Sequence, residues 1–106
     1  MKQLTIDPKY LQIKSFEGKE VKESNREVQS LLDKYAKELN DISEKEGLTF
    51  KGLQYQEMEA DELLYRVKVL ASNDEYFIFT IIVDKENDRA RVMGVISGVY
   101  KEYKMV

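Results

Sequence analysis

The spacing of apolar residues predicts one long amphipathic helix over residues 24–46. Its apolar positions recur at intervals of three and four, which places them on one helix face: Val28, Leu31, Leu32, Tyr35, Ala36, Leu39 and Ile42. Ser24 and Glu27 form a capping-box pattern at the start of this segment. Gly47 can take the left-handed conformation that ends a helix. We therefore expect an uninterrupted helix with one face buried in the core.

After Gly47 the apolar pattern changes to a period of two, which is typical of β-strands. Four strands are expected, separated by polar turns: residues 48–58, 65–71, 76–83 and 89–103. Gly52 shifts the phase of the first strand, which often marks a bulge. In the second strand Arg66 and Lys68 alternate with apolar residues, which is typical of a strand with one polar face.

These elements predict an α+β fold in which one long helix packs across a four-stranded antiparallel meander. The 106 residues are enough for one domain, so we expect a single domain over residues 1–106. Within it, residues 1–21 form an N-terminal arm or strand, residues 24–46 the helix and residues 48–103 the sheet.

Composition favours a protein without catalytic activity. The chain has no histidine and no cysteine, which excludes Ser-His-Asp and Cys-His nucleophilic sites and the usual zinc ligand sets. The five glycines fit no nucleotide-binding motif. Asp84, Glu86 and Asp88 are spaced like the start of a calcium loop, but Arg89 and Val95 occupy the positions of its glycine and its bidentate glutamate. We therefore expect no cofactor and no metal, with a carboxylate- or lysine-based enzyme as the open alternative.

Charge and hydropathy limit the partners and the compartment. The net charge of −3 argues against nucleic-acid binding, which usually needs a basic face. The longest apolar run, residues 76–83, is too short to span a bilayer, and the N-terminal sequence lacks the apolar region of a secretory signal. Together with the absence of cysteine, these features predict a cytoplasmic protein that does not bind membranes.

Several short segments resemble the cystatin superfamily, most closely the single-domain, disulfide-free stefins. The helix opens with Glu27-Val28-Gln29 and continues with Leu32-Asp33-Lys34, as in stefins. The following segments are also similar to stefin strands and turns: Leu53-Gln54-Tyr55, Tyr65-Arg66-Val67-Lys68-Val69 and Ser72-Asn73-Asp74-Glu75-Tyr76. The resemblance covers roughly residues 18–103 and implies a cystatin-like fold.

The same resemblance implies inhibition of papain-like cysteine proteases, which cystatins achieve with a wedge of one N-terminal segment and two hairpins. The inhibitory motif of the first hairpin would fall on residues 58–62, where Met58-Glu59-Ala60-Asp61-Glu62 lacks its glutamine and glycine and carries acids instead. The second hairpin, residues 84–88, has no apolar tip. The resemblance therefore does not extend to the inhibitory motif.

The first and third turns of an antiparallel meander lie at the same end of the sheet. This places seven acids on one rim, with Lys85 and Arg89 as the offsetting bases: Glu57, Glu59, Asp61, Glu62, Asp84, Glu86 and Asp88. We expect the rim to bind a basic protein surface through Glu59, Asp61, Glu62, Glu86 and Asp88. The open alternative is a solvated loop edge without a partner.

The outer face of the sheet is also apolar. If Phe77, Phe79, Ile81 and Val83 face the helix, then Tyr76, Ile78, Thr80 and Ile82 face away from it. A contiguous apolar patch is rarely left bare in a monomer. We expect residues 3–16 to cover it, and a homo-oligomer or partner interface is the alternative.

Three functions follow from the sequence. We expect a non-enzymatic protein-binding module, such as an inhibitor or antagonist of a macromolecular target. The first alternative is a cystatin-type inhibitor of papain-like proteases. The second is a small-ligand binder with a pocket between helix and sheet, which Tyr35, Tyr55 and Tyr65 could line.

Overall fold

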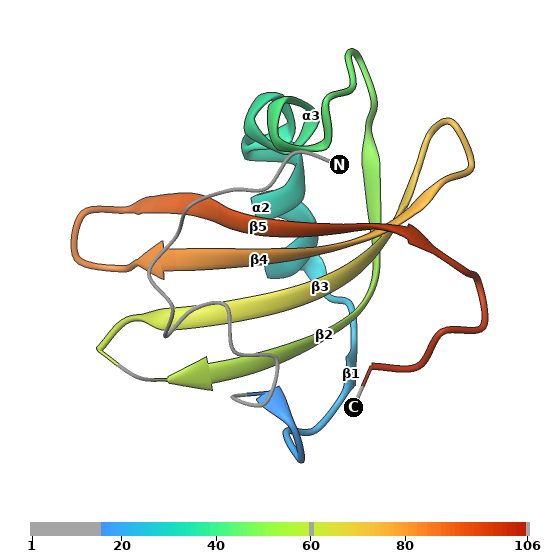
Figure 1. Ribbon diagram of the computed structural model, residues 1–106. Coiled ribbons are helices and arrows are strands. Elements are labelled where there is room, and N and C mark those ends of the chain that lie inside the picture. Colours follow the sequence, from blue (N-terminus) through green and yellow to red (C-terminus); the bar gives the residue numbers. More distant parts are fainter. Residues whose placement is uncertain (1–15, 60, 106) are drawn as a thin grey trace.

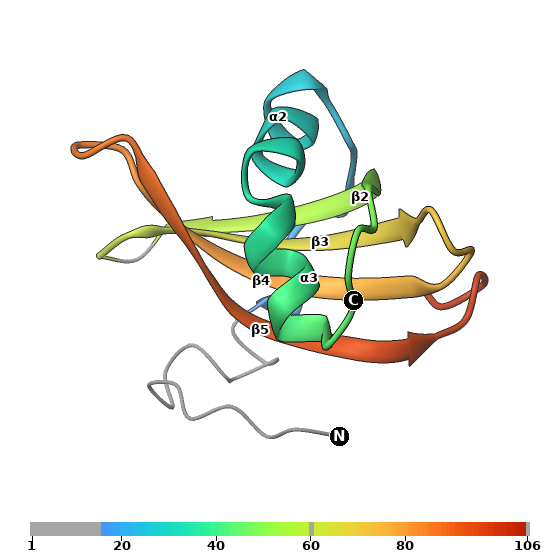
Figure 2. The ribbon, with the colours of Figure 1, turned by 90° about the horizontal axis from the view of Figure 1, so that it is seen from above.

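The computed structural model describes residues 16–59 and 61–105, which fold around a five-stranded antiparallel sheet in the order β1-β2-β3-β4-β5. The strands are β1 Lys22–Glu23, β2 Phe50–Glu59, β3 Leu63–Ala71, β4 Tyr76–Asp84 and β5 Arg89–Val99. Two helices, α2 Arg26–Lys34 and α3 Ala36–Ser43, lie across one face of this sheet (Figure 1). Figure 2 shows the β4–β5 hairpin bending toward the side on which the helices lie. The chain is therefore an α+β protein.

The single long helix expected over residues 24–46 is wrong, because the chain forms two helices that meet at Tyr35. The backbone angles of Tyr35 are φ −107° and ψ 23°, outside the helical range. Its hydroxyl accepts a hydrogen bond from the backbone N–H of Ala90 on β5, with an N···O distance of 2.9 Å. One non-helical residue hardly changes the spacing of apolar side chains, so Leu32 and Leu39 still lie on the same buried face. The sequence pattern therefore does not reveal the break.

Both predicted helix ends are also displaced. Helix α2 begins after Asn25, whose side-chain oxygen accepts a hydrogen bond from the backbone N–H of Val28 at 2.9 Å. Ser24 instead donates its backbone N–H to Leu53 on β2. Helix α3 ends at Ser43, and the next residue, Glu44, takes the left-handed conformation with φ 58°, three residues before Gly47. Ser24 and Asn25 are both good capping residues, so the sequence alone did not choose between them.

The four-stranded meander is wrong as well, because the sheet has a fifth strand, β1, which pairs with Tyr55 and Gln54 on β2. Two residues are too few to produce an alternation that a sequence pattern can detect. The last strand ends at Val99 instead of residue 103, directly after Gly98, which has φ 71°. The phase change predicted at Gly52 is confirmed by a register shift between Gly52 and Gln54.

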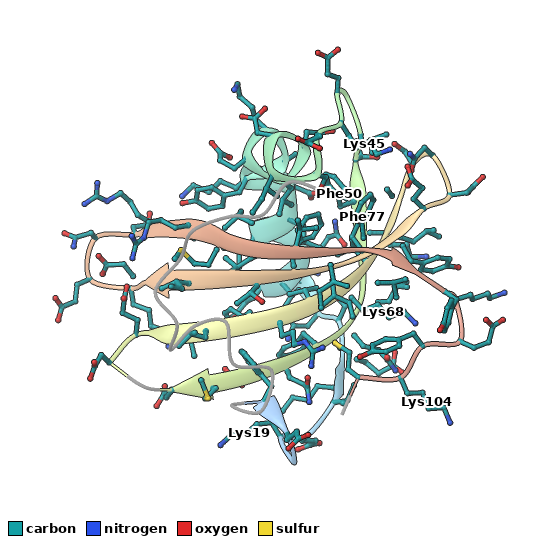
Figure 3. The ribbon with its side chains drawn as sticks, in the orientation of Figure 1. Lys19, Lys45, Phe50, Lys68, Phe77 and Lys104 are labelled. Carbon is teal, nitrogen blue, oxygen red and sulfur yellow. The ribbon has the colours of Figure 1, made fainter. Side chains whose placement is uncertain are left out.

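The main core lies between the helices and the inner face of the sheet. The predicted inward orientation of Phe77, Phe79 and Ile81 is confirmed, since all three are fully buried and pack with residues of both helices. Phe50 contacts Phe77 and Phe79 edge-on, with ring centroids 6.2 and 5.3 Å apart (Figure 3). This core fixes the sheet whose turns and outer face carry the polar features described below.

Candidate functional site

The β2–β3 and β4–β5 turns lie at the same end of the sheet (Figure 1). The strand register brings them together, because Leu63 pairs with Glu59 on β2 and with Val83 on β4. The two turns line one hollow of about 440 Å³, and its residues are Glu59, Asp61, Glu62, Leu63, Val83, Asp84, Lys85 and Glu86. Five of these side chains are carboxylates and one is a lysine. We refer to this feature as the acidic hollow.

The acidic hollow brings together four of the five predicted binding residues: Glu59, Asp61, Glu62 and Glu86. The fifth, Asp88, does not line it. Asp88 has φ 49° and lies instead along the groove between α2 and the β4–β5 hairpin. The hollow also contains Asp84, which belongs to the expected rim but is not among the predicted binding residues. Four of the five predicted residues therefore share one hollow with Asp84, and Asp88 lines the neighbouring groove.

Asp84 is held as an anion by the turn that it starts. The side-chain amide of Asn87 donates to one carboxylate oxygen of Asp84 at 2.7 Å, and the backbone N–H of Asn87 donates to the other at 3.3 Å. The bond from the Asn87 side chain is the main cause that lowers the pKa of Asp84 below its ordinary value. Asp84 therefore stays charged to more acidic pH than an ordinary aspartate.

Bases engage two acids near this end of the sheet. Lys22 on β1 bonds Glu57 with an Nζ–Oε1 distance of 3.1 Å, and this hydrogen bond raises the pKa of Lys22. Glu57, although part of the expected rim, does not line the acidic hollow. Arg91 on β5 lies 3.8 Å from Glu62, measured from Nη2 to Oε1. The acidic hollow is therefore bordered by a weak ion pair on its β5 side.

A second hollow, a groove of about 660 Å³, lies between α2 and the β4–β5 hairpin. Its apolar lining consists of Leu31, Tyr35, Val83 and Ala90, and its walls carry charges of both signs. Of the three tyrosines expected to line a pocket, only Tyr35 does so here. Tyr55 is buried and packs edge-on against Tyr65, with ring centroids 5.8 Å apart. Tyr55 and Tyr65 therefore pack in and against the core and do not line this groove.

The outer face of the sheet is covered at least in part by the chain itself. Phe16 is buried against Leu64 and Ile82, with Met58 and Met93 beside them. At the other end of this face, the ammonium group of Lys68 donates to the backbone carbonyls of Lys101 and Tyr103, both at 2.7 Å (Figure 3). Residues 3–15, which were expected to cover the face together with Phe16, lie outside the described residues.

Within residues 16–59 and 61–105, no three acidic side chains gather in a way that could hold a metal ion. Neither helix in this part of the chain is long and apolar enough to cross a membrane.

A scan of the chain against protein-family models and a search of the curated proteins both gave no match. Any functional conclusion therefore has to come from the chain's own geometry.

Proposed function

We propose that the chain is a non-enzymatic protein-binding module whose acidic hollow binds a basic surface of another protein. The observation that supports this is the convergence of five carboxylates from two turns that are more than 20 residues apart along the chain. Acids concentrated in one hollow create a negative potential that attracts cationic groups from a distance. A lysine or arginine side chain entering the hollow would meet carboxylates on both sides.

The free energy expected of ion pairs at the acidic hollow indicates which property of binding they control. Each exposed ion pair contributes only about 0–1 kcal/mol, because water and salt screen it. Several pairs formed together still accelerate association and select against acidic partners. We therefore expect the acidic hollow to control the rate and specificity of binding more than its strength.

A lysine oligopeptide is a direct probe of this proposal. In an NMR titration of the whole chain, the backbone amide signals of Glu59, Lys85 and Glu86 should shift first. The shifts should shrink as sodium chloride is raised from about 0.01 to about 1 M, because the screening length falls from about 30 to about 3 Å. A glutamate oligopeptide is the matched control and should leave these signals unchanged. Shifts spread evenly over the surface, or none at all, would refute the proposal.

Inhibition of papain-like proteases is the alternative that the resemblance to cystatins implies. Entry into a protease cleft would bury Glu59, Asp61 and Glu62 at the β2–β3 turn, and moving carboxylates out of water is unfavourable by several kcal/mol unless the cleft itself supplies cationic or hydrogen-bonding groups. We expect no inhibition of papain at sub-micromolar concentration. A tight inhibition constant in a standard peptide-hydrolysis assay would favour this alternative over the binding of a basic surface.

The groove beside α2 supports small-ligand binding as a second candidate function. Its volume of about 660 Å³ falls within the range of ligand pockets, roughly 300–1,000 Å³. Leu31 and Tyr35 give it an apolar lining, as such pockets usually have. An NMR screen with small aromatic fragments tests this candidate, since a true pocket would give saturable shifts at Leu31 and Ala90. Shifts that increase linearly without saturation would count against it.

A further inference from the structure

Arg66 is a buried cation at the centre of the outer face of the sheet. It lies on the middle strand β3, paired with Gln56 on β2 and with Thr80 on β4. Only 2% of its surface is exposed. Arginine is almost never buried to this degree unless it is paired with an anion.

The guanidinium group of Arg66 has little to bind among the described residues. Its Nη1 lies 3.5 Å from the side-chain oxygen of Gln56, at the outer limit of a hydrogen bond. Its Nη2 is buried and has no hydrogen-bond partner. The ion pairs formed within residues 16–59 and 61–105 involve other bases: Lys22, Lys37, Lys45 and Arg91.

The buried polar groups of this part of the chain show a charge imbalance. They are Asn40, Gln56, Arg66 and Lys68, which include two cations and no acid. Lys68 is satisfied by neutral groups, namely the carbonyls of Lys101 and Tyr103 and the ring of Tyr76 at 5.6 Å. Arg66 has no such set of acceptors. A guanidinium stays charged in proteins, so the charge of Arg66 calls for an anion beyond the described residues.

The position of Arg66 shows where an anion would bind. Leu64, Arg66 and Lys68 are successive residues on the outer side of β3. Phe16 packs on Leu64 at one end, and the segment of residues 100–105 is bonded to Lys68 at the other end. Arg66 therefore lies at the seam between these two covering segments.

Gln56 fixes the geometry on the β2 side of this seam. Its amide nitrogen donates to the carbonyls of Phe16 and Lys19, both at 3.1 Å. This orients the amide so that its oxygen faces Nη1 of Arg66. With Gln56 beside Nη1, Nη2 is left as an unsatisfied donor.

We propose that Arg66 binds a small oxyanion, a carboxylate or phosphate group, at the seam between residues 16–19 and residues 100–105. The planar guanidinium presents donors in a fixed fork that matches both kinds of oxyanion. The binding neutralises a charge that the described part of the chain leaves unpaired. This site is on the outer face of the sheet and is independent of the acidic hollow.

Thermal unfolding with added anions tests this site. Sodium phosphate and sodium acetate are compared with sodium chloride at the same pH and ionic strength, using the whole chain. Phosphate or acetate should raise the Tm by about 5–10 °C when its concentration is about ten times its dissociation constant, and the rise should follow a saturation curve. The two salts distinguish a phosphate site from a carboxylate site. An equal response to all three salts would overturn the proposal.

Arg66→Met removes the charge and keeps a long side chain. This variant should lose the anion-dependent rise in Tm, and without added anion it should be at least as stable as the wild type, because an apolar side chain is better suited to a buried site than an unpaired charge. Arg91→Met is the matched control, since Arg91 is exposed, and it should keep the rise. If Arg66→Met shows the same rise as the wild type, the anion binds elsewhere and the proposal is wrong.

NMR of the wild-type chain gives a second readout that does not depend on any variant folding. Titration with inorganic phosphate or acetate should shift the side-chain Nε–H signal of Arg66 and the side-chain amide of Gln56 to saturation. The corresponding signal of Arg91 should stay in place. No shift at Arg66, or equal shifts at Arg66 and Arg91, would overturn the proposal.

Discussion

The side-chain oxygen of Gln29 on α2 accepts a hydrogen bond from the backbone N–H of Gly52 on β2, with an O···N distance of 2.9 Å. The amide nitrogen of the same side chain donates to the carbonyl of Phe50 at 2.8 Å. Both residues pair with β3 on one side of β2, whereas on the other side β1 pairs only with Gln54 and Tyr55 and does not reach them. Gln29 thus replaces the missing partners and ties helix α2 to the sheet.

Replacing Gln29 by alanine should lower the free energy of unfolding by about 1–3 kcal/mol, because it leaves the Gly52 N–H and the Phe50 carbonyl without these bonds in a partly buried place. Urea denaturation followed by circular dichroism measures this change. Ser30→Ala is the control, since Ser30 is exposed on the same helix, and its effect should stay within about 0.5 kcal/mol. Equal effects of the two substitutions would show that the Gln29 bonds contribute nothing.

Gly52 is also required for close packing. A Cβ atom at this position would lie 2.5 Å from the hydroxyl oxygen of Ser24 and 3.1 Å from a methyl group of Leu32. Gly52→Ala should therefore destabilise the fold by about 1–3 kcal/mol. Ser24→Ala removes the closest contact, so the double variant should recover part of this loss. If the double variant loses as much stability as the two single variants together, the result contradicts the predicted clash.

Asp84 offers a prediction about pH. The hydrogen bond from the Asn87 side chain is the main cause of its lowered pKa, so Asn87→Ala should raise the Asp84 pKa toward about 3.9, the ordinary value for aspartate. Because the pKa of Asp84 is lower in the folded state than in the unfolded state, the charged carboxylate stabilises the fold at pH values above the unfolded-state pKa. This stabilisation is lost as the pH falls through the folded-state pKa. The wild type should therefore lose more stability than the variant below about pH 3.9.

Carbon-detected NMR titration of the carboxyl groups measures these pKa values directly. Glu75 is the internal control, because its pKa is lowered mainly by a hydrogen bond from Lys45, far from Asn87. The Asn87→Ala variant should leave the Glu75 pKa in place. If the Asp84 pKa does not move in the variant, the turn does not hold Asp84 as an anion.

The sequence predicted the strands and their inward faces because apolar side chains recur there with a period of two. It failed where one residue departs from a regular pattern. Tyr35 interrupts the helix without disturbing the apolar spacing, and its tie to Ala90 is a contact between residues 55 positions apart. Such long-range bonds leave no local signal.

The candidate sites were likewise predictable from the sequence only in part. The convergence of the two acidic turns follows from antiparallel topology alone, so Glu59 and Glu86 could be placed together from the sequence. The separation of Asp88 depends on the local turn conformation. The burial of Arg66 could not be predicted, because a polar residue that alternates on a strand normally faces water, and here Phe16 and residues 100–105 cover the neighbouring positions.

The binding of a lysine oligopeptide to two charge-matched variants tests the central claim most directly. Glu59→Gln with Glu86→Gln removes two charges from the acidic hollow, and Glu38→Gln with Glu46→Gln removes two exposed charges elsewhere. At low salt, the first pair should weaken binding by about threefold to tenfold, while the second pair should leave the dissociation constant nearly unchanged. An equal loss in both double variants would mean that the peptide responds only to net charge, and it would contradict a binding site at the acidic hollow.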